Sequence, residues 1–440
     1  MNDYPFGNYL YELRKSAGLS QSQAARLLGL SDKAVSKWEN GRAKPTTESL
    51  RKLAVLYKVP VEELLRRREE KKPPAITKIV LTGGPSAGKT TGQSWIQNSF
   101  TKLGYAVLFV PETATELMSA GVKPAFFRSA LEFQRAILRF QLDKERVFEE
   151  AARNMQADKV LIVCDRGAMD NKAYMSELEF SALLREFGLT EVELRDRYDA
   201  VFHMVTAAKG AERFYTTENN KVRTETPAQA RALDDKLIAA WTGHPHMRVI
   251  GNTGSFEDKL KHLVAEIRSF LGEPRPMEIE RKFLIEYPDL KQLERLPNCR
   301  KVDIIQTYLR PQGEYEVRVR QRGEKGSYFY FKTLKRTLGD ATRIELEERL
   351  SQDEYLRTLM DADPRRRPIR KTRYCLTWNE RYYEVDIYPL WQDRAILEME
   401  LHDENEPVRL PPWLKLIREV TDDPAYRNSA LALREPESGE

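Results

Sequence analysis

The pattern of apolar and polar residues changes twice along the chain, and each change marks a different kind of structure. Up to about residue 66, apolar residues recur at helical spacing, which predicts short helices. Next, short apolar runs such as Ile79–Leu81, Ala106–Val110 and Val160–Cys164 alternate with helical patterns, which predicts a parallel sheet. From residue 277 most segments alternate strictly, with one helical stretch near Asp353–Asp361, which predicts an antiparallel barrel or a strongly curved sheet.

Two segments have the composition expected of linkers between these parts. Arg66–Ala75 is highly charged and ends near two prolines, and Gly272–Met277 contains a glycine and two prolines. We therefore expect a multi-domain chain: an all-α helix-turn-helix at 1–70, an α/β P-loop domain at 76–271 and a β barrel with added helices at 277–435.

Composition and charge narrow the functional classes. The 440 residues carry a net charge of only +5, but the first 74 hold 15 Lys and Arg against 9 Asp and Glu. This basic excess favours nucleic acid as a partner, with an ordinary solvated surface as the alternative. Cys164, Cys299 and Cys375 lie far apart without metal-ligand spacing, which indicates a reducing compartment and argues against a zinc site. With no signal-peptide core and no apolar run of roughly 20 residues, we expect a cytoplasmic protein without a membrane partner.

Residues 20–41 follow the pattern of a helix-turn-helix. Ser20 is placed to cap the first helix, Gly29 suits a left-handed turn, and Ser31 is placed to cap the second helix. The positions spaced to pack inward are Ala24, Ala25, Leu28, Val35 and Trp38.

The outward face of the second helix is the candidate DNA-reading surface, because this helix lies in the major groove in such motifs. The candidates for base contacts are Asp32, Lys33, Ser36 and Lys37, and those for phosphate contacts are Gln21, Arg42 and Lys44. Over about residues 6–66 the pattern closely resembles the XRE-type, lambda-repressor-like family. The resemblance implies binding of double-stranded DNA, commonly as a homodimer, although some such domains bind protein.

A phosphate-binding loop follows the first apolar strand of the second segment. The run Gly83-Gly84-Pro85-Ser86-Ala87-Gly88-Lys89-Thr90-Thr91 fits the Walker A pattern. Glycines allow backbone N–H groups to surround phosphate oxygens, Lys89 can reach the β and γ phosphates, and Thr90 can ligate Mg²⁺. The loop therefore predicts ATP as a substrate.

Side chains beyond the loop are candidates for the chemistry, because ligands gather at the carboxyl ends of parallel strands. At one such end, Asp165 suits a metal-side carboxylate and Arg166 a phosphate ligand. At another, Glu112 suits a base for a substrate hydroxyl, with a helix cap as its alternative. Arg213 and Arg223 lie in a polar stretch that suits a lid over the phosphates, with surface salt bridges as the alternative.

Residues 78–271 together resemble the P-loop ATPase and kinase-like family, which includes AAA-type members. This family is related to nicotinamide riboside kinases and, more distantly, to deoxynucleoside kinases. The resemblance implies nucleotide binding by Gly88, Lys89 and Thr90, with Glu112 as base and Asp165-Arg166 for metal and phosphate. No nucleoside pocket can be identified in the sequence, so the phosphate acceptor stays open.

Charged residues alternate with apolar ones on at least five predicted strands of the third segment, and side chains two apart on a strand share a face. The acidic pairs are Glu278 and Glu280, Glu345 and Glu347, Glu384 and Asp386, and Glu398 and Glu400. The basic residues are Lys282, Arg318, Arg320, Lys332, Arg343, Lys371 and Arg373. If these faces converge, the acids can hold divalent cations and the bases a polyphosphate, whereas the alternative is a sheet with one solvated face.

The Glu-x-Glu-x-Lys start at Glu278, the later charged pairs and the closing run EVTDDPAYRNSALA resemble the CYTH domain of the triphosphate tunnel metalloenzymes over about residues 277–433. The resemblance implies an eight-stranded antiparallel tunnel and metal-assisted phosphoryl transfer, in which the basic residues grip phosphates and the acidic pairs hold Mg²⁺ or Mn²⁺. Members of this family include tripolyphosphatases, thiamine and RNA triphosphatases and class IV adenylate cyclases.

The leading expectation is an enzyme that processes a triphosphate in the tunnel and is coupled to a P-loop ATPase or kinase, with a DNA-binding module. One alternative is a transcription regulator that senses nucleotides or polyphosphates. Another is an enzyme that processes RNA or nucleotide ends.

Overall fold

A computed structural model describes residues 5–69, 74–214, 226–273, 277–337, 342–401 and 407–433. The chain divides into two compact units, one of residues 1–75 with 151–159 and the other of residues 76–150 with 160–440. Across the described ranges, no helix is long and apolar enough to cross a membrane.

The first part of the chain folds into short helices: α1 (Pro5–Ser16), α2 (Gln21–Leu28), α3 (Asp32–Glu39), α4 (Thr47–Tyr57) and α5 (Val61–Glu69). The Ser20 side chain accepts a hydrogen bond from the Gln23 N–H, and the Gln23 side chain accepts one from the Ser20 N–H, so the predicted cap is confirmed. Gly29 takes the predicted left-handed conformation, with φ of 68°. Ser31 occupies the N-cap position of α3, but its side chain accepts no backbone hydrogen bond there, so its predicted capping bond is wrong. All five predicted inward positions are buried.

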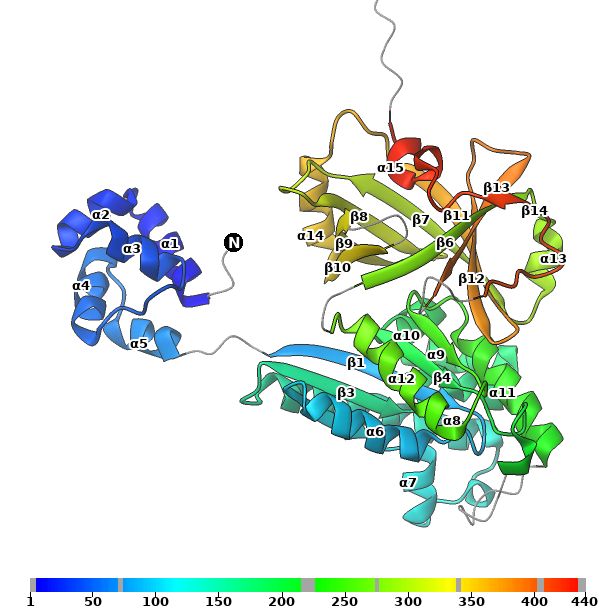
Figure 1. Ribbon diagram of the computed structural model, residues 1–440. Helices are drawn as coiled ribbons and strands as arrows, with labels where there is room; N and C mark the ends of the chain where they lie inside the picture. Colours follow the sequence, from blue (N-terminus) through cyan, green and yellow to red (C-terminus); the bar gives the residue numbers. More distant parts are fainter. Residues whose placement is uncertain are drawn as a thin grey trace, which may run out of the picture. The chain divides into compact units, whose positions relative to one another are not determined.

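A parallel sheet forms the centre of the P-loop segment, as predicted, and its five strands lie in the order β2-β3-β1-β4-β5. Strands β3, β1 and β4 of this sheet are labelled in Figure 1. Its strands are β1 (Ala75–Gly83), β2 (Tyr105–Val110), β3 (Lys159–Asp165), β4 (Ala200–Met204) and β5 (Met247–Ile250). The helices of this segment are α6 (Lys89–Thr101), α7 (Thr113–Ser119), α8 (Ala130–Arg153), α9 (Glu177–Phe187), α10 (Glu191–Arg195), α11 (Pro227–Trp241) and α12 (Phe256–Phe270), with single turns η1 (Pro124–Phe126), η2 (Ala168–Tyr174) and η3 (Glu212–Phe214).

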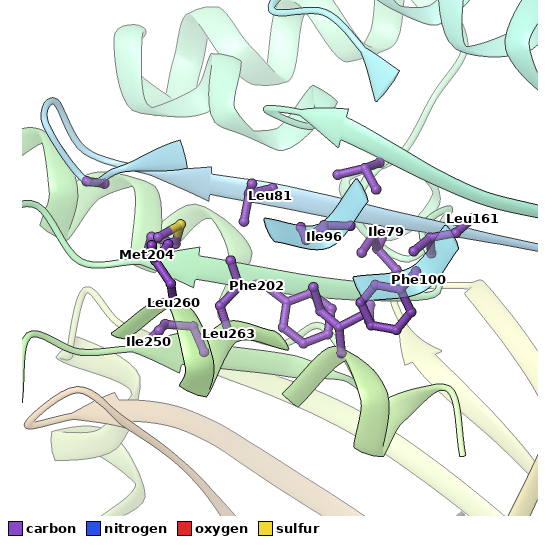
Figure 2. Packing of buried hydrophobic residues seen from close by; sticks show 14 of the residues in the cluster. Ile79, Leu81, Ile96, Phe100, Leu161, Phe202, Met204, Ile250, Leu260 and Leu263 are labelled. Atoms are coloured by element: carbon purple, nitrogen blue, oxygen red, sulfur yellow. The ribbon is translucent and has the colours of Figure 1, made fainter. Parts of the chain in front are cut away.

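Helices α6 and α12 cover one face of this sheet. Figure 2 shows apolar side chains of β1 and β4, among them Leu81 and Phe202, packed against Ile96 of α6 and Leu263 of α12. This core anchors the start of α6, and therefore the phosphate-binding loop before it, to the carboxyl end of β1.

The third segment is an antiparallel barrel. Its strands are β6 (Met277–Glu286), β7 (Cys299–Tyr308), β8 (Glu316–Glu324), β9 (Ser327–Thr337), β10 (Thr342–Leu350), β11 (Ile369–Trp378), β12 (Arg381–Ile387), β13 (Arg394–Glu400) and β14 (Leu416–Glu419), and its helices and single turns are α13 (Leu290–Arg295), α14 (Gln352–Thr358), η4 (Leu359–Asp361), η5 (Pro424–Tyr426) and α15 (Asn428–Leu431). The strand order is β10-β9-β8-β7-β11-β12-β13-β6-β14, and β10 also pairs with β6. That extra pairing closes β6 to β13 into the predicted eight-stranded barrel, with β14 added along β6.

The register of the strands decides which side chains point inward. Arg318 on β8 lies opposite Thr333 on β9, and Thr333 lies opposite Glu347 on β10. Residues directly opposite one another in a ladder share a face, so these three belong to the interior. Their neighbours Val317 and Val319 point the other way and are buried in an apolar cluster that includes Tyr355 of α14.

Candidate functional site

The phosphate-binding loop joins β1 to α6. Gly83 has φ of 149°, and a Cβ there would lie 2.1 Å from the carbonyl oxygen of Met204, so only glycine fits this position. Gly88 takes a left-handed conformation with φ of 91° and places Lys89 at the first position of α6. Residues 86–91 line a cavity of about 1110 Å³, which makes the N-terminal end of α6 one wall of the candidate nucleotide site.

Gly83, Gly84 and Pro85, the first three residues of the predicted ATP-binding run, do not line this cavity. Two of them are instead hydrogen-bonded to residues from other parts of the domain. Asp234 of α11 accepts hydrogen bonds from the backbone N–H groups of Gly84 (2.9 Å) and Thr206 (3.1 Å). The Thr206 hydroxyl in turn donates to the Pro85 carbonyl oxygen at 2.5 Å. Burial raises the pKa of Asp234, but the charges of His203 and Lys209 outweigh it and hold this pKa below its ordinary value. Asp234 was missed from the sequence because it lies 150 residues from Gly84.

The predicted strand-end side chains gather at the same cavity. Glu112 and Asp165 line it, whereas Arg166 does not. Instead the Arg166 Nε donates to Glu112 Oε1 at 2.6 Å, and Thr115 donates to Glu112 Oε2 at 2.9 Å. Burial raises the pKa of Glu112, but the charges of Arg166 and Lys89 together outweigh burial and lower this pKa to about 2.

Asp165 has an oxygen to offer a ligand. Its Oδ2 accepts a hydrogen bond from Gln93 Nε2 at 2.8 Å, while its buried Oδ1 has no hydrogen-bond partner among the described residues. Together with Thr90 on the same cavity, this carboxylate fits the predicted Mg²⁺ position. A second buried acid, Asp170, accepts hydrogen bonds from Thr82 and Trp241 behind the loop, and burial raises its pKa.

The predicted lid is described only at its start. Arg213 lies in η3 and is exposed, and Ala211 just before it lines the cavity. Arg223 lies outside the described residues. The lid therefore stays a prediction.

The interior of the barrel gathers most of the predicted charged residues around a cavity of about 180 Å³. Those that line it are Glu280, Lys282, Arg318, Arg320, Glu345, Lys371, Arg373, Glu384, Glu398 and Glu400. Polar residues that the sequence did not single out line it too: Gln306, Tyr308, Glu316, Arg322, Lys335, Arg427, Asn428 and Ser429. The charged faces of the strands converge, as the sequence predicted.

Acids and bases alternate closely around this cavity. Lys282 Nζ lies 3.1 Å from Glu280 Oε2 and also donates to Glu398. Arg373 Nη2 donates to the other oxygen of Glu398 at 2.6 Å, and Nη1 of the same guanidinium donates to Glu384. On the opposite strands, Glu345 pairs with Arg318 at 3.1 Å and with Lys335 at 2.8 Å.

Two predicted metal ligands do not line the cavity. Asp386 is fully buried and accepts hydrogen bonds from Lys371 and Arg373, so it holds these two basic side chains in place. Glu347 accepts hydrogen bonds from Arg320 at 2.7 Å and Thr333 at 3.2 Å. Burial raises the pKa of Glu347, but Arg320 and His246 together outweigh burial and lower this pKa to about 2.

The prediction for Lys332 is wrong. Lys332 lies opposite Val319 on β8 and Glu348 on β10, so it shares the outer face with the apolar valines. Lys335, three residues later, lies opposite Glu316 and Glu345 on the inner face. The error arises because residues 328–334 have no clear alternation, so the sequence did not fix which lysine points inward.

Two further predicted residues meet where the barrel closes. Glu278 of β6 lies directly opposite Arg343 of β10 in the register. Their side chains lie outside the described part of the structure, so their predicted roles in metal and phosphate binding stay predictions.

The acidic residues of the cavity fit a divalent cation in chemical type. Glu280, Glu384, Glu398 and Glu400 supply carboxylate oxygens, which Mg²⁺ and Mn²⁺ prefer. Within the described ranges, no three acidic, histidine or cysteine side chains are grouped as metal ligands, and each of these four pairs with a basic side chain. Four carboxylates beside a bound triphosphate would nevertheless repel it, so a cation between them is the chemically consistent arrangement.

The candidate DNA-binding residues lie on α2, α3 and the turn after α3. Lys33, Lys37, Arg42 and Lys44 are exposed, while Ser36 accepts a hydrogen bond from Asn40 at 3.2 Å. Gln21, a predicted phosphate contact, instead donates to Glu39 at 2.7 Å, and Glu39 pairs with the buried Arg14. The side chain of Asp32 is outside the described part of the chain.

Known proteins are similar to each of these parts. The AAA domain family matches residues 78–259, and the helix-turn-helix family matches residues 10–64. The chain is 34% identical over 169 residues to the inorganic triphosphatase of Nitrosomonas europaea, covering 36% of this chain and 99% of that protein. It is 39% identical over 64 residues to the HTH-type transcriptional activator BcrR of Enterococcus faecalis, covering 14% of this chain and 31% of BcrR.

A solved structure is also similar to part of the chain. The crystal structure of an inorganic triphosphatase is 29% identical with a TM-score of 0.25, covering 36% of this chain and 96% of that one. Because the sequence relative from Nitrosomonas is covered almost completely, the chain belongs to the inorganic triphosphatase (CYTH) family, and it carries a AAA P-loop domain and a helix-turn-helix domain as well.

Proposed function

We propose that the barrel hydrolyses a triphosphate-bearing molecule with the aid of Mg²⁺ or Mn²⁺, and that the P-loop domain binds and turns over ATP. One observation carries the first part. In a closed barrel, basic and acidic side chains line one small cavity, among them Arg318, Arg320, Lys335, Lys371 and Arg373, with Glu280, Glu384, Glu398 and Glu400. A linear triphosphate with its metal matches this mixture of charges.

The chain's own residues would act by binding and by neutralising charge. The basic side chains contact the non-bridging phosphate oxygens, and Asp386 holds Lys371 and Arg373 in place for this role. A water oxygen attacks the terminal phosphorus, the bond from this phosphorus to the bridging oxygen breaks, and the diphosphate part leaves with the electron pair. The water proton passes to solvent, and the products are phosphate and a diphosphate. A metal ion held by the acidic set would supply a Lewis acid.

The P-loop domain has a separate site. The backbone of residues 86–91, the Lys89 side chain and the N-terminal end of α6 suit the phosphates of ATP, while Thr90 and Asp165 suit its Mg²⁺. Either water or a hydroxyl-bearing acceptor can receive the γ-phosphoryl group. Kinase activity would require Glu112 to act as the base. Because the low pKa of Glu112 makes its carboxylate a weak proton acceptor, ATP hydrolysis is the favoured hypothesis.

The helix-turn-helix supports a DNA-binding module and, with it, a regulator as the second candidate function. The supporting observations are the exposed Lys33, Lys37, Arg42 and Lys44 and the similarity of this part to a transcriptional activator. In that case ligand binding by the other two domains would control DNA binding.

A panel of inorganic and organic triphosphates, incubated with the protein and Mg²⁺ or Mn²⁺, tests the proposal. Phosphate release that Glu280→Gln abolishes and Lys89→Ala leaves unchanged would support the barrel as the site. If no triphosphate is hydrolysed while ATP or a polyphosphate changes DNA affinity, the regulator becomes the better description.

A further inference from the structure

The P-loop sheet reaches the carboxylates of the barrel through two side chains near the start of β5. His246 Nε2 lies 3.2 Å from Oε1 of Glu347 on β10. Arg248, on β5, donates through Nη2 to Oε2 of Glu400 on β13. Both contacts lie within one compact unit, so a segment outside the barrel touches two of the predicted metal-binding acids.

Arg248 is itself fixed from behind. Its Nε lies 3.4 Å from Oε2 of Glu266 on α12, and Glu266 is 6% exposed. A planar guanidinium presents N–H groups along more than one edge, so it can bridge two carboxylates in a fixed geometry, whereas the donors of an ammonium group rotate. Arg248 therefore sets the orientation of Glu400.

The segment that carries these side chains is anchored to the barrel. Arg322 of β8 is almost fully buried and donates to the Gly243 carbonyl oxygen at 2.5 Å and to Asp196 at 3.2 Å. Tyr382 of β12 donates to the His244 carbonyl oxygen at 3.0 Å. The backbone just before His246 is thus held by buried hydrogen bonds, which keeps Arg248 in register with Glu400.

The contact lies at a second cavity. A space of about 460 Å³ is lined by Arg248 and Glu266 on one side and by barrel residues on the other. It shares four residues with the barrel cavity, namely Glu280, Glu384, Glu398 and Glu400. These four carboxylates therefore lie between the two cavities, and residues of β5 in the P-loop sheet form part of the wall of the second cavity.

We propose that Arg248 is a positioning residue of the barrel site: supplied by the P-loop domain, it holds Glu400 in the orientation that binds the divalent cation. The inference rests on the proposed function for the identity of the bound group. Residues that orient metal-binding side chains typically change metal affinity about 10- to 100-fold when they are removed. The barrel of this chain thus depends on a residue of another domain.

The test measures Mn²⁺ binding directly, by electron paramagnetic resonance of free Mn²⁺, with the full-length protein and without nucleotide. Under these conditions the P-loop, whose metal is held in part by substrate phosphates, contributes little. Glu280→Gln identifies the barrel-bound Mn²⁺ as the binding that this variant loses. Arg248→Ala should weaken that binding about tenfold or more, and Arg248→Lys should restore only part of it.

Matched variants separate positioning from general damage. Glu266→Gln should weaken Mn²⁺ binding in the same direction but less, and it keeps the test valid if Arg248→Ala does not fold. Arg268→Ala, exposed on the same helix as Glu266, should bind Mn²⁺ like the wild type. Unchanged or tighter Mn²⁺ binding in Arg248→Ala would overturn the inference. If Arg248 controls Mn²⁺ but no triphosphate is hydrolysed, only the proposed function fails.

Discussion

Arg166 and Glu112 form an ion pair beside the phosphate-binding loop, with 2.6 Å between the guanidinium Nε and the carboxylate Oε1. Burial alone would raise the pKa of Glu112, but Arg166 and Lys89 together bring it to about 2. The carboxylate is therefore ionised at neutral pH and is a weak proton acceptor. Its clearest contribution is to hold Arg166 next to the nucleotide cavity.

This ion pair predicts a pH-dependent stability. Since the folded-state pKa of Glu112 lies below its ordinary 4.5, the pair stabilises the fold above about pH 4.5, and this contribution is lost as pH falls toward 2. The upper limit is about 3 kcal/mol. Glu112→Gln should lower the thermal unfolding midpoint more at pH 7 than at pH 3. An equal shift at both pH values would show that the pair is not formed.

Lys89→Ala should separate the two phosphate sites. Removing the charge aimed at the transferring phosphate should cut ATP turnover by about a hundredfold or more. Hydrolysis by the barrel should stay within about twofold of the wild type, because the barrel has its own basic residues. Lys102→Ala, an exposed residue just after α6, is the control and should leave both activities unchanged. A wild-type rate of ATP turnover in Lys89→Ala would contradict this assignment of the loop.

Lys332 and Lys335 offer a matched pair on one strand. Lys335 faces the cavity and pairs with Glu345, so Lys335→Ala should reduce triphosphate hydrolysis by about tenfold or more. Lys332 faces outward, and Lys332→Ala should leave hydrolysis near the wild-type rate. Steady-state phosphate release under Mg²⁺ and Mn²⁺ measures both. A larger effect at Lys332 would mean that the register of β9 is shifted.

DNA binding should weaken steeply with salt, because Lys and Arg displace counterions from the phosphates. Lys37→Ala should change the preferred sequence, whereas Arg42→Ala should weaken all sequences alike and lower the salt slope by about one. Lys52→Ala, exposed on α4, serves as the control. Fluorescence anisotropy with labelled duplexes measures these effects, and the absence of binding to any duplex would favour a protein partner instead.

Local sequence patterns were enough to predict much of the fold. The Walker A run fixed the position of the loop and the start of α6, since its glycines and Lys89 are contiguous. Strict alternation around Glu280, Glu398 and Glu400 identified the inner face of the strands, because side chains in a strand repeat every two residues.

The residues that were missed depend on distant contacts. Asp234 supports Gly84 from another helix, and Arg322 crosses from the barrel to Gly243. Neither position has a local signal, since a buried acid or arginine looks like a surface charge in the sequence. Lys335 was missed for a different reason, because the aromatic run before it is apolar on both faces.

The closure of the barrel has a consequence for its dynamics. In the described residues, β6 is joined to β13 by seven registered residue pairs, from Glu286 to Glu280, but to β10 by three, between 277–279 and 342–344. The β12–β13 join also has three registered pairs, so the β6–β10 seam is one of the two shortest joins of the cylinder in the described residues and one of the easiest to part. Amide hydrogen exchange should therefore be faster along residues 277–279 than along 280–286.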